Sequence, residues 1–253
     1  MEKSNHTLSE TITGIPACII LSLSAVTAYF VAMASGASTG AFMVIRVIIS
    51  VITFAIAMVV ASQKRHSLFI HCVFFGLMCF FLFQLWNFAN FLWIANETGD
   101  NIVETISVMG FNMFLFSASF GALDSLADDG SKALHKYRLK AFLLTAVFIA
   151  LFLIKLLTGF SILVCVYGIV LCPLIYLGIK HILIPDIDSG FVRVLRTYYV
   201  VVLILVLAES VEALTFGLPG YGKILAVLRG IITIIAIWLF PMAMKGVRQW
   251  TSL

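Results

Sequence analysis

The stretch TITGIPACIILSLSAVTAYFVAMASGASTGAFMVI, residues 11–45, contains no charged residue. It is too long for one membrane span, which needs about 20 apolar residues. The run is interrupted by the small and polar segment Ser35-Gly36-Ala37-Ser38-Thr39-Gly40, which is typical of a turn. We therefore predict two transmembrane helices here, one over about 12–34 and one over about 40–62.

The rest of the chain repeats this pattern. The sequence is 62% hydrophobic and only 11% charged, whereas a soluble domain carries about a quarter charged residues. Uniformly apolar runs fit helices better than the alternating strands of a membrane barrel. Six further helices are expected at about 67–95, 101–125, 139–157, 160–182, 191–216 and 222–244. The fold class is therefore an all-α polytopic transmembrane bundle of about eight helices, with residues 1–253 forming a single transmembrane domain.

The fifth and sixth helices need an argument of their own. The sequence from Ala141 to Ile179 contains one charge, Lys155. A single helix of that length would be about 58 Å long, nearly twice the thickness of a hydrocarbon core. Two helices with a turn at Thr158-Gly159 fit the membrane better.

The distribution of basic residues predicts the orientation. With the N-terminus inside, the predicted outer turns hold only Lys155 and Lys223, and the inner segments hold twelve basic residues. These twelve are Lys3, Lys64, Arg65, Lys132, Lys136, Arg138, Lys140, Lys180, Arg193, Arg196, Lys245 and Arg248. Cytoplasmic loops carry such an excess of lysine and arginine. We expect a multi-pass protein of the plasma (inner) membrane with both termini in the cytoplasm.

Four ionisable side chains fall inside predicted spans, where each is costly and needs a partner. They are Arg46, Glu209, Glu212 and Arg229. Counted from the nearest outer turn at about 1.5 Å per residue, all four lie at a similar depth below the outer surface. Glu209 and Glu212 share one helical face because they are three residues apart. Arg229 is placed to bridge them.

Further polar side chains are expected in the same outer half of the membrane: amides and an indole on the third helix, and a carboxylate on the fourth. The candidate residues are Trp86, Asn87, Asn90 and Glu104, with Gln84 and Asn112 close by in the sequence. Two interpretations stay open. The polar groups either line a pocket that opens to the outside, or they form a buried network that only holds the helices together.

The pocket interpretation predicts a membrane protein that binds a small polar ligand or a lipid headgroup, in a sensing or accessory role. The arrangement in hairpins is similar to the multi-helix input modules of bacterial sensors, in architecture only. Such a protein would contact the lipid bilayer and act through a membrane-protein partner or a homo-oligomer. One alternative is a secondary transporter of a small polar solute, and a third is a lipid-modifying enzyme.

No catalytic pattern supports the enzyme hypothesis. The sequence lacks a Walker loop, a Gly-x-Ser-x-Gly motif, a His-Glu-x-x-His motif and a Rossmann fingerprint. We expect no cofactor and no metal, and the modest net charge of +4 gives no basic stripe for nucleic acid. The five cysteines are interpreted as apolar packing residues.

The inner edge is interpreted as solvated. The loop from Asp124 to Lys132 contains the spacing Asp-x-x-x-Asp-Asp but lacks a full calcium-loop pattern. His181 follows an apolar run beside Lys180 and is expected at the inner surface in contact with water.

Overall fold

The computed structural model describes residues 15–63, 68–93, 102–124, 128, 130–159, 161–185, 191–219 and 221–251, and no strand occurs among them. The long α-helices are α2 (Ile15–Ala34), α3 (Thr39–Gln63), α4 (Leu68–Trp93), α5 (Ile102–Phe116), α7 (His135–Thr158), α8 (Ile162–Leu183), α9 (Phe191–Thr215) and α10 (Tyr221–Thr251). The π-helix η1 (Ser117–Asp124) continues α5, and the 3-10 helix η2 (Lys132–Leu134) precedes α7. The predicted all-α helical bundle is confirmed.

Seven of these helices are long and apolar enough to cross a membrane. The eighth, α5, is shorter and reaches the same length only together with η1. Because a membrane offers no water to backbone groups, helices that satisfy their own hydrogen bonds are suited to it. The protein is therefore a multi-pass membrane protein.

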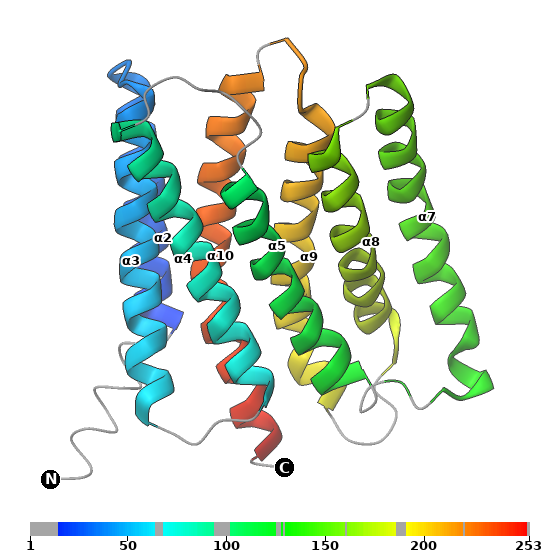
Figure 1. The fold of residues 1–253 in the computed structure, drawn as a ribbon. Coiled ribbons are helices and arrows are strands. Elements are labelled where there is room, and N and C mark those ends of the chain that lie inside the picture. The colour runs from blue at the N-terminus through cyan, green and yellow to red at the C-terminus, as the bar shows by residue number, and fades with distance from the viewer. Residues whose placement is uncertain are drawn as a thin grey trace, which may run out of the picture.

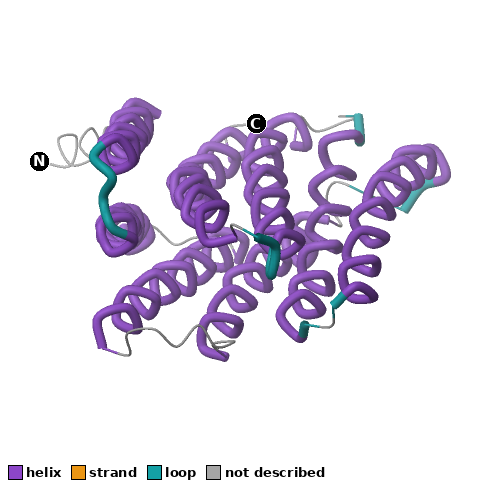
Figure 2. The backbone as a smooth tube through the Cα atoms, turned by 90° about the horizontal axis from the view of Figure 1, so that it is seen from above, coloured by secondary structure: helices purple, strands orange, loops and turns teal. Residues whose placement is uncertain are grey.

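The helices stand in two rows. One row runs α2, α10, α9, α8 and α7, and the other runs α3, α4 and α5, with α3 and α4 packed on α10 and α5 packed on α8. Figure 1 shows α7 at one edge of the bundle and the α2–α3 hairpin at the other, and Figure 2 shows the same helices from above. The interior lies where α4, α5, α8, α9 and α10 meet, and it is there that buried polar groups can face one another.

The positions of the first and last described helices allow the two ends of the bundle to be named. The start of α2 and the end of α10 lie on the same side (Figure 1). We call this side the inner end, following the predicted orientation, and the opposite side the outer end.

A tight turn at the outer end separates the first two helices, as the sequence predicts. Gly36 has a φ of 65°, a left-handed conformation that costs glycine little. The N–H of Ala37 donates to the carbonyl of Ala32 at 2.9 Å, which closes α2 by the usual C-terminal hydrogen-bond pattern. Two spans therefore arise from one uncharged run.

Two helices extend beyond the ranges expected from hydropathy. The expected start at about 139 is preceded by one further turn, because α7 begins at His135. The expected end at about 244 is exceeded by α10, which continues to Thr251. Backbone hydrogen bonds do not need apolar side chains, so a helix can continue past the edge of the apolar run.

Candidate functional site

A small cavity lies in the outer half of the bundle between α4, α5, α8, α9 and α10. Its lining residues are Phe80, Phe83, Gln84, Ser107, Val108, Phe111, Tyr167, Glu209, Glu212, Arg229 and Ile232. The centre of a water-sized sphere fits in about 10 Å³ of it, which is room for about one water molecule. The structure thus brings three of the four charged residues predicted from the sequence to one void.

The α9–α10 hairpin supplies an ion pair to this cavity. Nη2 and Nε of Arg229 each lie 3.1 Å from Oε1 of Glu212. The guanidinium also lies over the ring of Phe83, 5.3 Å from its centroid, where the face of the ring attracts a cation. The pairing places both charges at one depth, as the count along the two helices predicts.

Glu209 has a different environment from Glu212. Its side chain is buried, with the residue only 4% exposed. Nδ2 of Asn112 donates to its Oε2 at 2.7 Å and also lies 3.1 Å from the carbonyl oxygen of Val108. No basic side chain contacts Glu209 within the described ranges. The sequence-based expectation that Arg229 bridges both glutamates is therefore met for Glu212 alone.

Helix α4 adds buried donors near the cavity. Nε2 of Gln84, Nε1 of Trp86 and Nδ2 of Asn87 are buried and have no hydrogen-bond partner in the part of the chain that the structure describes. Gln84 lines the cavity and is only 2% exposed. A buried donor without an acceptor costs about 1–3 kcal/mol, so these groups call for an acceptor such as water or a ligand. We use the term outer cluster for Gln84, Asn87, Asn112, Glu209, Glu212 and Arg229.

The remaining predicted site residues lie outside the cavity wall. Arg46 of α3 is buried, and its charge acts on Tyr29 of α2. Trp86 and Asn90 are partly buried on α4. None of these lines the cavity, and neither does Asn87. The side chain of Glu104 lies outside the described residues.

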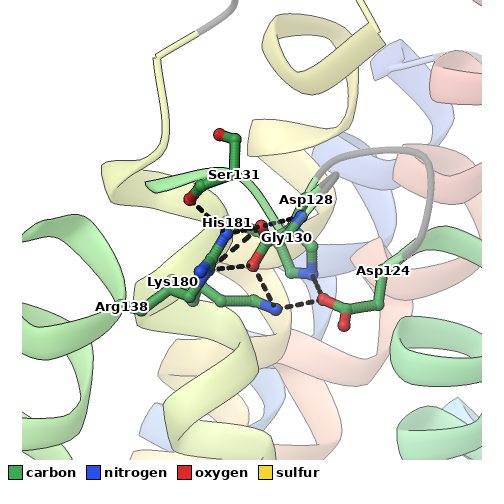
Figure 3. Close-up of polar contacts among 7 residues, drawn as sticks. All are labelled: Asp124, Asp128, Gly130, Ser131, Arg138, Lys180 and His181. Atoms are coloured by element: carbon green, nitrogen blue, oxygen red, sulfur yellow. Dashed lines mark hydrogen bonds and ion pairs between the residues drawn. The ribbon is translucent and has the colours of Figure 1, made fainter. Parts of the chain in front are cut away.

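A second group of charges, not predicted from the sequence, lies at the inner end (Figure 3). We use the term inner cluster for Asp124, Asp128, Arg138, Lys180 and His181. Nζ of Lys180 donates to Oδ1 of Asp124 and lies 3.3 Å from Oδ2 of Asp128. Arg138 of α7 donates to Asp128 through Nη2 at 2.6 Å and through Nε at 2.8 Å. These contacts join η1, the following loop, α7 and α8.

The electrostatics of the inner cluster favour ionised carboxylates. Burial works against the charge of Asp128, but hydrogen bonds from Arg138 and the backbone N–H of Gly130 and the charge of Lys180 outweigh it. Together they lower the pKa of Asp128 to about 2. Burial is likewise outweighed at Asp124, where contacts with His181 and Lys180 lower the pKa of the carboxyl. The two carboxylates are thus paired with basic side chains, while Nδ1 of the buried His181 ring makes no hydrogen bond within the described residues.

His181 corrects the interpretation of the inner edge. It was expected in water, but its side chain is 0% exposed, and Lys180 is 3% exposed. Nε2 of His181 lies 3.1 Å from Oδ1 of Asp124, and the ring stacks on Tyr199 with centroids 4.3 Å apart. The carboxylates of Asp124 and Asp128, which belong to the loop that was expected in water, are likewise partly buried and tied into this network. Basic residues at an inner membrane edge are explained by topology alone, so nothing in the sequence pattern indicates that they are buried.

An apolar layer separates the two clusters. Along α5 and η1 the interval between Asn112 and Asp124 contains Leu115, which is fully buried, and along α9 the interval between Glu209 and Tyr199 contains Leu205, also fully buried. No group of three or more histidine, cysteine, aspartate or glutamate side chains suited to a metal occurs among the described residues. The arrangement can bind and exchange protons or polar groups.

Fold and site together define a multi-pass helical membrane protein with buried charges in both halves of the bundle. Comparison with family models, with curated proteins and with solved structures found no match. The functional argument therefore rests on the geometry of the two clusters.

Proposed function

We propose that the protein binds a small polar or zwitterionic ligand, or a lipid headgroup of that chemistry, at the outer cluster. The unsatisfied buried donor of Gln84 in the cavity wall carries this proposal, because a network built only for packing has no reason to leave it without an acceptor. Arg229 would contact the anionic part of the ligand, and Glu209 its cationic part. Asn87, Asn90, Trp86, Glu104 and Arg46 would support the site from its surroundings.

The small volume of the cavity limits the size of what enters without a change in structure. With room for about one water molecule, a larger ligand must separate Arg229 from Glu212 and take their place as partner. The α9–α10 hairpin carries both residues, so ligand entry changes the position of this hairpin. The bundle would pass such a change to a membrane-protein partner or to a second copy, which suits a sensing or accessory role.

Thermal stabilisation by ligand tests the proposal. The full chain in nanodiscs is heated with glycine, glycine betaine or glycerophosphocholine. These probes are a small zwitterion, a zwitterion with a quaternary ammonium group and a lipid headgroup without its acyl chains. A bound probe at a hundred times its dissociation constant stabilises the folded state by about 2.7 kcal/mol. We expect one probe to raise the melting temperature of the parent and to leave the double variant Glu209→Gln/Glu212→Gln unchanged.

The control for this experiment is Asp128→Asn, which neutralises a carboxylate in the inner cluster. It should keep the response to the probe, even if its own melting temperature is lower. Equal stabilisation of the parent and the double variant contradicts binding at the outer cluster. So does the absence of a response in the parent to all three probes.

Secondary transport is a second candidate, and the inner cluster favours it. A binding site in the outer half and an ionic network in the inner half, with apolar residues between them, are the parts that alternating access requires. In proteoliposomes, a transporter would accumulate the stabilising probe when a pH gradient is imposed. A sensing protein would bind the probe without accumulating it.

A further inference from the structure

We propose that Glu209 is a proton-binding site, at which the carboxyl group takes up and releases a proton in the course of ligand binding. The inference deepens the proposed function and rests on the same cavity. It names a proton as a second species that the outer cluster binds.

Glu209 is buried and has no cationic partner among the described residues. Glu209 is 4% exposed, and its one polar contact among the described residues is the amide of Asn112 at 2.7 Å. An ionised carboxylate in such a place is costly, because a single amide donor does not replace the water it has lost. A proton on Glu209 removes this cost.

The groups facing Glu209 from each neighbouring helix support the same conclusion. On its own helix, the nearest charge is Glu212, which repels a second negative charge. On α10, Arg229 lies against Glu212, so its charge is offset there. The other polar groups of this region are neutral: Asn112 on α5, Gln84 on α4, and Ser107 and Tyr167 in the cavity wall.

Two further polar atoms, on residues that line the cavity or contact Glu209, are available to a small bound species. Nε2 of Gln84 and Oδ1 of Asn112 are both buried without a partner in the described part of the chain. A water molecule in the cavity can contact Gln84 and Glu209, which both line it, and can carry a proton to or from Glu209. The void is too small for a hydrated metal cation, so a proton suits it better than sodium.

Proton uptake by Glu209 needs only water and a proton. Oε2 of Glu209 accepts the hydrogen bond from Asn112, which leaves Oε1 to form the new O–H bond. A hydronium ion delivered by the cavity water gives up one proton, and a neutral carboxylic acid and a water molecule result. Release is the reverse step, with the proton returning to water.

Infrared difference spectroscopy tests the inference without any knowledge of the ligand. The full chain in nanodiscs is stepped between acidic and alkaline pH, and the C=O band of a protonated buried carboxylic acid is followed. We expect the parent and the inner-cluster control Asp128→Asn to show this band and to lose it at alkaline pH. Glu209→Gln should lack the band altogether. A band that persists in Glu209→Gln, or is missing from the parent at every pH, overturns the inference.

A second measurement guards against a folding defect in Glu209→Gln. The melting temperature is recorded against pH, and again with sodium chloride in place of potassium chloride. Because the neutral acid is the form that burial favours, the parent should lose stability as the pH rises above the usual titration range of glutamate, and Glu209→Gln should not. Stabilisation of the parent by sodium but not by acid would make the site a sodium site and overturn the proposal.

The two proposals can fail separately. A titrating band assigned to Glu209 with no response to any probe leaves the proton site standing and removes the ligand. If Glu209→Gln responds to a probe as fully as the parent does, and the parent shows no carboxylic acid band at any pH, the proton site is removed and the ligand site remains.

Discussion

The two charged clusters of this bundle differ in how their carboxylates are paired. In the inner cluster each carboxylate contacts a basic side chain, and Lys180 joins Asp124 and Asp128. In the outer cluster Glu209 has an amide as its partner, and the Nε2 of Gln84 has none in the described chain. The carboxylates of the inner cluster are paired with cations of the protein, whereas Glu209 of the outer cluster contacts an amide and no cation among the described residues.

This difference leads us to expect that the inner cluster stabilises the bundle, and it is consistent with the proposed ligand at the outer cluster. A buried network that is fully satisfied rigidifies the helices that it joins, and a partly satisfied one is costly unless it is completed. The inner cluster connects α5, through η1, to α7 and α8 at one end. Substitutions at the two ends should therefore differ in size and even in sign.

The largest effect is expected from Lys180→Met. It removes the cation that Asp124 and Asp128 share and leaves two carboxylates with less compensation. Breaking a buried ion pair on one side typically costs about 3–5 kcal/mol. Chemical unfolding of the detergent-solubilised protein should show a loss of this order. The exposed Lys140→Met on α7 is the matched control and should change stability little. Equal behaviour of the two variants would show that the inner cluster does not hold the bundle together.

A smaller effect is expected from acid at the same cluster. The pKa of Asp128 lies near 2, below its ordinary value of 3.8. The unfolded chain therefore takes up this proton first, and the stabilisation from Asp128 is present above about pH 4 and lost as the pH falls toward about 2. Melting temperatures measured across this range should fall less steeply for Asp128→Asn than for the parent. Parallel curves for the two proteins contradict the ionic role of Asp128, and Lys140→Met should run parallel to the parent.

The helices and the Glu212–Arg229 pair were open to prediction from the sequence. Apolar length, the break at Gly36 and the excess of basic residues each limit where a helix can cross, and together they gave eight helices. The depth of Arg229 and Glu212 follows from counting residues on either side of a single turn. Both inferences depend on distance along a helix, which the sequence states directly.

The rotation of each helix was not open to prediction in the same way. Where every face of a helix is apolar, the sequence does not show which face meets its neighbours, because no polar side marks the solvent. His181 was therefore placed in water although α8 turns it onto Asp124 and Tyr199. The π-helical end of α5, which carries Asp124 to this contact, left no recognisable pattern either. The depth of a charged residue in the membrane therefore does not identify the side chain that it contacts.

The smallest effect, and the one with the opposite sign, is expected from Gln84→Met. Methionine has a similar size and no donor to satisfy, so the ligand-free protein should be as stable as the parent or more stable by about 1 kcal/mol. Asn112→Leu is the matched control on α5: it removes a hydrogen bond that the structure does make, and it should cost about 0.6–2 kcal/mol. If Gln84→Met is instead as destabilising as Asn112→Leu, the Gln84 amide already has a partner inside the protein. The contrast between paired carboxylates at the inner end and an unsatisfied donor at the outer end would then disappear, and with it the reason to expect a ligand there.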